Sequence, residues 1–151
     1  MVLPINPDID LLTSLLEQED FSEIFALADQ VRFQYKGDDV QVRAILEFSN
    51  YCRRQCRYCG LNSRNLNCRR FRMKPEEMVL TAHEAYEAGY HTIVLQSGED
   101  PWYTPEILGE IVREIKKDPI AVTVSCGEMD KGAYARLKAC GADRYLIKHE
   151  T

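Results

Sequence analysis

Three cysteines lie close together in the sequence, Cys52, Cys56 and Cys59, with the spacing C-x3-C-x2-C. Thiolates are ligands for zinc ions and for iron–sulfur clusters, so the triplet predicts a metal site. Three ligands on a cube-shaped cluster leave one iron open for a small molecule. A zinc site would need a fourth ligand, which Cys68 would supply, although C-x3-C is less usual for zinc than C-x2-C.

The cysteines lie in a basic segment of an otherwise acidic chain. Residues 51–74 contain seven Arg, one Lys and no acid, whereas the whole chain has a formal net charge of −5. Such a segment suits an anionic cofactor or an acidic redox partner, and a solvated basic loop explains it equally well. Only Tyr51, Tyr58 and Phe71 could stack on bases, so we expect no nucleic-acid partner.

The composition is that of a globular protein. Apolar residues make up 45% of the chain and charged residues 28%, which argues against intrinsic disorder. No apolar run reaches the roughly 18 residues that a membrane helix needs, and residues 1–10 lack the layout of a secretory signal. Six cysteines without an export signal favour metal ligation or burial over disulfides. We therefore expect a cytoplasmic protein with no membrane partner.

Two helices are expected in an N-terminal helical segment, residues 1–40. In the first helix Asn6 is the expected N-cap and Pro7 fits the first turn, followed by an apolar stripe up to residue 16. The second helix follows Asp20 and keeps a helical apolar rhythm up to the break at Gly37. We expect both helices to cover the base of the domain that follows.

Strands and helices alternate through the second expected domain, residues 41–151. Strands are expected at residues 42–48, 92–96, 120–125 and 144–149, and helices at 75–88, 105–115 and 130–140. Lys74 precedes the first of these helices and is a poor cap, which costs ~1 kcal/mol against Ser or Thr. Apolar strands joined by helices predict a parallel sheet, either an open doubly wound sheet or part of a barrel.

The residues that follow the expected strands are mostly polar and include the cysteine triplet. In both architectures ligands bind at the carboxyl ends of the strands. These residues should therefore share one rim of the domain: 49–59, 97–100, 125–128 and 149–151.

The cysteine loop, with Tyr58 just before its last cysteine, resembles that of the radical S-adenosylmethionine (SAM) enzymes. Other segments resemble, more specifically, the E-type maturases of iron-only (FeFe) hydrogenases. These segments are EFSN at 47–50, RFRM at 70–73 with PEE at 75–77, TIVLQSGEDP at 92–101, AVTVS at 121–125 and GADRYLIKHET at 141–151. Biotin synthase and methylornithine synthase are relatives of these maturases, and the resemblance covers roughly residue 41 to the end.

The resemblance implies an α/β fold, the N-terminal portion of a radical SAM partial TIM barrel with about four parallel strands. It implies a 4Fe–4S cluster that donates an electron to bound SAM and cleaves it to methionine and a 5′-deoxyadenosyl radical, in maturation of the hydrogenase H-cluster. The implied partners are a small-molecule or iron-complex substrate, an electron donor such as flavodoxin or ferredoxin, and other hydrogenase maturases.

The resemblance also assigns roles to individual residues. The implied cluster ligands are Cys52, Cys56 and Cys59, and Tyr58 matches the aromatic residue near the adenine of SAM. The other implied SAM contacts are Ser97, Gly98 and Glu99 for the amino group, Ser125 and Glu150 as polar contacts, and Lys148 for the carboxylate. Lys148 stands where the family more often has Arg. The positive charge is kept, but a lysine cannot form the two parallel hydrogen bonds by which an arginine binds a carboxylate.

Two alternatives remain open. The first is a radical SAM enzyme with chemistry like that of biotin synthase or methylornithine synthase, and the second is a non-catalytic module that binds zinc or an iron–sulfur cluster. Among the remaining cysteines, we expect Cys126 and Cys140 to be buried, and we assign no role to Cys68. The three histidines are expected to be ordinary surface or hydrogen-bonded residues.

A radical SAM barrel needs about six strand–helix units, some ~200 residues or more, whereas only four strands are expected here. We therefore expect a fragment, natural or engineered, that binds a cluster but cleaves SAM poorly or not at all by itself. The strand expected at residues 144–149 would be an edge strand, open to self-association or to docking of further strands.

Overall fold

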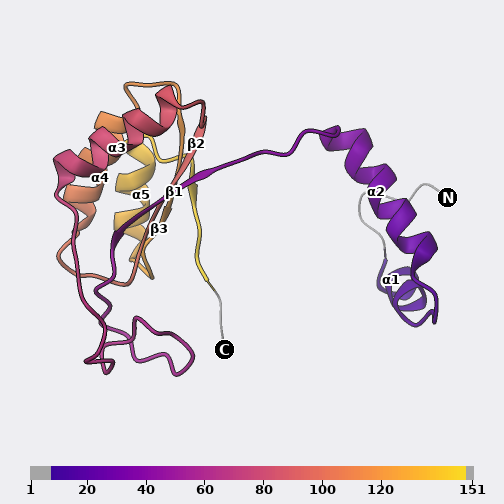
Figure 1. Ribbon diagram of the computed structural model, residues 1–151. Helices are drawn as coiled ribbons and strands as arrows, with labels where there is room; N and C mark the ends of the chain where they lie inside the picture. The colour runs from indigo at the N-terminus through magenta and orange to yellow at the C-terminus, as the bar shows by residue number, and fades with distance from the viewer. Residues whose placement is uncertain (1–7, 149–151) are drawn as a thin grey trace. The chain divides into compact units, whose positions relative to one another are not determined.

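The computed structural model describes residues 8–148 of the protein, which divides into two compact units at residues 41 and 42. The first unit contains α1, Ile9–Leu16, and α2, Ser22–Lys36 (Figure 1). Helix α1 is capped by Asp8, whose Oδ1 accepts from the backbone N–H of Leu11 at 2.8 Å. The expected cap Asn6 lies outside the described residues, and the expected packing of both helices on the second unit stays a prediction.

Helix α2 begins and ends where the sequence indicates. Asp20 accepts hydrogen bonds from the backbone N–H and the hydroxyl of Ser22, which fixes the turn into the helix. Gly37 ends the helix with φ +68°, in the left-handed region that glycine adopts without steric cost.

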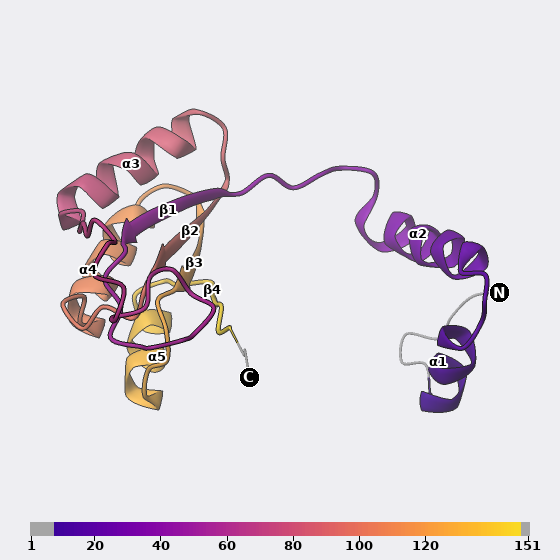
Figure 2. The same cartoon turned by 60° about the horizontal axis from the view of Figure 1, so that its bottom comes forward.

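The second unit is a four-stranded parallel sheet with strand order β1-β2-β3-β4. Its strands are β1, Ala44–Ser49, β2, Thr92–Ser97, β3, Ala121–Ser125, and β4, Arg144–Tyr145. The helices that connect them are α3, Pro75–Glu87, α4, Pro105–Ile115, and α5, Lys131–Ala139. Figures 1 and 2 show these helices side by side on one face of the sheet. Sequential strand order with helices on one face is the arrangement of a barrel and not of a doubly wound sheet.

A side-chain oxygen near the start of each connecting helix accepts a free backbone N–H group. The Asp130 carboxylate accepts from the N–H of Ala133 at 2.8 Å at the start of α5. At the start of α3 the backbone N–H of Lys74 donates to the Glu77 carboxylate at 2.7 Å. This contact is one half of a capping box, so Glu77 partly compensates for the poor cap at Lys74.

The core lies between the sheet and the three helices. Alternate strand residues are buried against the helices, among them Leu46, Phe48, Ile93, Leu95, Val122 and Val124. The ring of Tyr103 meets Phe48 edge to face at 4.6 Å between centroids, so the segment before α4 closes one end of this core. The other face of the sheet is less covered, and Ile45 and Glu47 on β1 are exposed there. The sheet is therefore not buried evenly on both faces.

The fourth strand is shorter than expected. It covers only Arg144–Tyr145 of the expected residues 144–149, and it pairs with β3 through Thr123 and Val124. The backbone N–H of Leu146 still donates to the Val124 carbonyl at 2.9 Å, after which regular pairing stops. Within the described residues β4 has a neighbour on one side only, and Leu146 and Ile147 are about half exposed.

None of the helices within residues 8–148 combines the length and the apolar character needed to cross a membrane.

Candidate functional site

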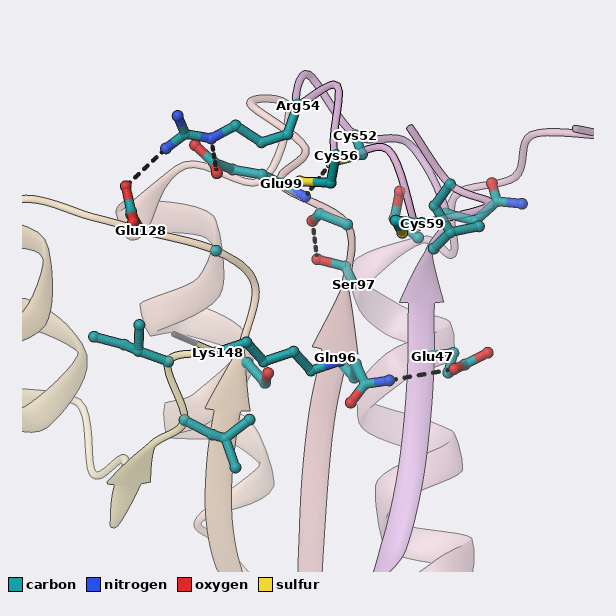
Figure 3. A pocket seen from close by; sticks show the side chains of 18 of the residues that line it. Glu47, Cys52, Arg54, Cys56, Cys59, Gln96, Ser97, Glu99, Glu128 and Lys148 are labelled. Carbon is teal, nitrogen blue, oxygen red and sulfur yellow. Dashed lines mark hydrogen bonds and ion pairs between the residues drawn. The ribbon is translucent and has the colours of Figure 1, made fainter. Parts of the chain in front are cut away.

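The cysteine triplet lies in the long loop between β1 and α3, which passes over the carboxyl end of the sheet (Figure 3). Its cysteines line a cavity of about 500 Å³ together with residues that follow β2 and β3. All the described site residues expected from the sequence line this cavity: Cys52, Cys56, Tyr58, Cys59, Ser97, Gly98, Glu99, Ser125 and Lys148. Glu150 lies outside the described residues. The structure thus brings the others together, while the role of each stays a prediction.

The three thiols are free and differ in exposure. Cys56 is exposed, whereas Cys52 and Cys59 are half-buried. The backbone N–H of Glu99 donates to the Cys52 sulfur at 3.4 Å, which ties the cysteine loop to the end of β2. Within residues 8–148, no three His, Cys, Asp or Glu side chains are gathered closely enough to hold a single metal ion. The chemistry of three thiol donors that line one cavity fits an iron–sulfur cluster, which cysteine thiolates hold.

Gly98 allows the end of β2 to lie directly against the cysteine loop. A Cβ atom at this position would lie 2.2 Å from the Tyr51 carbonyl oxygen and 2.8 Å from the Cys52 Cβ. The backbone N–H of Gly98 also donates to the Ser49 carbonyl at 3.2 Å. Only glycine permits this approach, so Gly98 fixes the position of Cys52 through backbone contact.

Glu99 is bound by two arginines of the cysteine loop. Its Oε1 accepts from Arg53 Nε at 2.6 Å, and its Oε2 accepts from Arg54 Nε at 2.6 Å, the second of these contacts being drawn in Figure 3. Burial by itself would raise the pKa of the Glu99 carboxyl, but hydrogen bonds from Arg54 and Arg53 outweigh it and hold the pKa below its usual value. Arg54 also reaches Glu128, with its Nη2 2.8 Å from Oε2. Glu99 was expected to face the amino group of SAM, and in this structure its carboxylate faces these arginines.

A buried ion pair, which the sequence did not reveal, anchors both ends of the cysteine loop. The Asp100 carboxylate has no exposed surface and accepts from Ser49 Oγ at 2.6 Å and from Arg72 Nε at 2.7 Å. Burial would raise the pKa of Asp100, yet the hydrogen bonds from Arg72 and Ser49 keep it below its usual value. The Arg72 guanidinium also lies 3.8 Å from the centre of the Tyr51 ring, and Tyr51 directly precedes Cys52 in the sequence.

The cavity continues along the less covered face of the sheet. Glu47 on β1 and Gln96 on β2 line it and are joined by a hydrogen bond of 3.3 Å. Lys148 lies across from them in Figure 3, at the end of the described chain. Ser125 is buried at the end of β3, and the Ser97 hydroxyl donates to the Gly98 carbonyl at 2.6 Å.

The remaining cysteines lie outside this arrangement. Cys68 does not line the cavity, and its sulfur accepts from Asn50 Nδ2 at 3.7 Å. Cys126 is buried, with its sulfur 3.3 Å from the Tyr145 hydroxyl, and burial raises the pKa of its thiol to about 11. Cys140 is also buried, packed between helices where Arg113 reaches its sulfur. Burial of Cys126 and Cys140 confirms the expectation for these two residues.

Sequence comparison assigns this arrangement to a family. Residues 46–151 match the sequence profile of the radical SAM superfamily. The chain belongs to this superfamily. The expected radical SAM fold, part of a (β/α) barrel, is thereby confirmed together with the observed parallel sheet.

Individual radical SAM proteins are similar over most of the chain. The [FeFe] hydrogenase maturase subunit HydE of Thermotoga maritima is 53% identical over 137 residues, which cover 90% of this chain and 39% of HydE. The 3-methylornithine synthase of Methanosarcina acetivorans is 32% identical over 97% of this chain and 42% of its own. The crystal structure of methylornithine synthase (PylB) superposes with a TM-score of 0.79 at 30% identity, over 91% of this chain and 42% of that one. The chain therefore spans about two fifths of the length of these radical SAM relatives.

Proposed function

We propose that this chain is the cluster- and SAM-binding part of a radical SAM enzyme that acts in maturation of the FeFe-hydrogenase H-cluster. The observation that carries the proposal is the shared cavity, because the three cysteines and the strand-end residues face one space. The 53% identity to HydE supports hydrogenase maturation over the chemistry of methylornithine synthase, at 32% identity.

In this proposal Cys52, Cys56 and Cys59 hold a 4Fe–4S cluster and leave one iron open to SAM. When bound, the cluster would supply the electron for reductive cleavage of SAM to methionine and a 5′-deoxyadenosyl radical. The protein itself would bind and orient the cluster and SAM, and it would exclude water from them. The proposed SAM contacts are Tyr58, Ser97, Gly98, Glu99, Ser125, Lys148 and Glu150.

Glu99 connects the SAM contacts to the basic loop. Its side chain is only 10% exposed, and its carboxylate accepts two charge-assisted hydrogen bonds, from Arg53 and Arg54. We propose that a SAM amino group competes with one of these arginines for Glu99. Arg54 has a second acceptor in Glu128, so it can leave Glu99 without losing every carboxylate contact.

The proposed partners follow from the same chemistry. A one-electron donor such as flavodoxin or ferredoxin would reduce the cluster, and a small molecule or an iron complex would be the substrate, with other hydrogenase maturases acting beside it. Cys56 and its neighbour Arg57 are exposed, so an acidic donor can reach the loop from outside. We place the enzyme in the cytoplasm, where cysteines such as its six free thiols stay reduced.

Anaerobic reconstitution with iron and sulfide in competition with zinc tests the proposal. We expect iron and sulfide in the stoichiometry of a 4Fe–4S cluster, and a change in the electron paramagnetic resonance spectrum of the reduced cluster when SAM is added. Stoichiometric zinc without iron would instead favour a zinc-binding module. Cys68→Ser distinguishes the two directly, because it would remove a ligand from the zinc site but none from the cluster.

A further inference from the structure

Arg70 donates hydrogen bonds to four backbone carbonyls of the cysteine loop. Its Nη1 lies 2.5 Å from the Asn50 oxygen and 2.9 Å from the Leu61 oxygen. Its Nη2 lies 2.8 Å from the Asn62 oxygen and 3.3 Å from the Asn65 oxygen. A planar guanidinium with five N–H donors can serve several acceptors at once, whereas a lysine ammonium cannot reproduce this geometry.

The acceptors lie on opposite sides of the cysteine triplet in the sequence. Asn50 precedes all three cysteines and Leu61 follows them, so one side chain joins the two ends of the segment that carries the thiols. The backbone N–H of Ser63 donates to the Arg54 carbonyl at 2.8 Å, which extends this connection into the stretch between the first two cysteines. Arg70 thereby sets how far apart the two ends of the loop lie.

Arg70 differs in its partners from the other arginines that organise the site. Arg53, Arg54 and Arg72 each form an ion pair with a carboxylate, and within residues 8–148 Arg70 forms none. Its half-buried charge is met by carbonyl dipoles alone. A cation without a counter-ion, bound to the segment that carries the three thiols, is suited to a loop that gains negative charge when thiolates and a cluster occupy it.

We propose that Arg70 is a positioning residue that holds the cysteine loop in its cluster-accepting arrangement before the cluster binds. It acts through backbone carbonyls and is not itself a ligand. The inference rests on the proposed function only for the identity of the group that the loop accepts. The order that Arg70 imposes on the loop is a property of the metal-free protein and is measured there.

Hydrogen exchange of the metal-free protein tests this order. The loop amides of Asn62, Ser63 and Asn65 have backbone acceptors and should be protected in the wild type. In Arg70→Gln we expect them to exchange about tenfold faster or more, with β2 and β3 unchanged. Arg69→Gln is the matched control, because Arg69 is exposed and its side chain has no partner among residues 8–148.

Two results would overturn the proposal. One is loop protection in Arg70→Gln equal to that of the wild type. The other is loss of protection in the sheet as well as the loop in both Arg70→Gln and Arg70→Lys, because Arg70 would then support the whole fold. We expect Arg70→Lys to keep the sheet intact and to restore loop protection only in part.

Chemical rescue gives a readout that general stability would not move. We expect Arg70→Ala to take up iron about tenfold more slowly than the wild type during reconstitution, and millimolar guanidinium to restore the rate. Ammonium at the same ionic strength should not restore it, and equal rescue by both ions would contradict the proposal. A wild-type protein that takes up no iron would refute the proposed function, whereas the exchange measurement would still decide the role of Arg70.

Discussion

At the residue scale, several side chains that organise the loop, namely Arg70, Arg72 and Asp100, lie outside the set expected to contact the cofactors. The expected contacts could be read from the sequence because they follow short motifs, C-x3-C-x2-C and SGED. The organising residues could not be predicted from the sequence, because Asp100 contacts Ser49 and Arg72, which are 51 and 28 residues away in the chain. Arg70 was hidden for another reason, since its partners are backbone carbonyls, which any residue type supplies.

Gly98→Ala should displace the cysteine loop. The new methyl group would fall within 2.2 Å of the Tyr51 carbonyl oxygen, a rigid backbone atom. We expect the free energy of unfolding to fall by about 1–3 kcal/mol, measured by urea denaturation. Gly60→Ala is the control, because a Cβ there meets no atom within 4 Å. Equal stability of the two variants would contradict the close approach at Gly98.

Asp100→Asn should destabilise the second unit. The change removes a fully buried charge and leaves the Arg72 guanidinium, whose side chain is 35% exposed, without its carboxylate. Because water can partly solvate Arg72, we expect a loss of about 1–3 kcal/mol in urea denaturation and not the larger cost of an isolated buried charge. Glu106→Gln, which breaks a solvent-exposed pair with Arg136, should change little.

Acid should weaken the fold through Glu99 and Asp100. The pKa values of both carboxyls are depressed in the folded protein relative to ordinary values of 4.5 and 3.8. Their contribution to stability is therefore present above the unfolded-state pKa and is lost as the pH falls through the folded-state pKa. We expect the urea concentration at the unfolding midpoint to decrease once the pH is below about 4. The difference in free energy of unfolding between the wild type and Asp100→Asn should become smaller in the same pH range. A difference independent of pH would contradict the ionised Asp100–Arg72 pair.

At the element scale, the sequence predicted the alternation of strands and helices well, and it predicted the ends less well. Helix α4 matches its expected bounds because Thr104 and Pro105 fix its start, whereas β1 and β4 differ from theirs. The end of β4 depends on pairing with β3, a contact between distant segments that no local pattern encodes. Periodicity also does not show which face of the sheet the helices cover, which is why an open sheet and a barrel could not be distinguished from the sequence.

The start of α3 offers a test at this scale. Glu77→Ala removes the carboxylate that accepts the Lys74 backbone N–H at 2.7 Å, whereas Glu76→Ala removes only a first-turn acid. We expect Glu77→Ala to cost about 0.5–1 kcal/mol more than Glu76→Ala in thermal or urea unfolding. Equal losses in the two variants would show that the capping contact does not stabilise the helix.

At the scale of the whole molecule, the second unit is a segment of a barrel whose carboxyl-end loops face one cavity. Four strands in sequential order place the cysteine loop, Gly98–Glu99 and Ser125 at that end. The inner face carries Glu47 and Gln96, which line the same cavity. Relatives are more than twice as long, and the matched residues cover 39–42% of their length.

We propose that the three clustered cysteines, and not the other three, hold a cluster with an open iron. Mössbauer and iron analysis of reconstituted protein, with each of the six cysteines changed to serine in turn, test it most directly. We predict about four irons per chain, one of them distinct from the rest, lost in Cys52→Ser, Cys56→Ser and Cys59→Ser. The Cys68, Cys126 and Cys140 variants should retain it. Iron uptake that survives loss of Cys56 but not of Cys68 would contradict the claim.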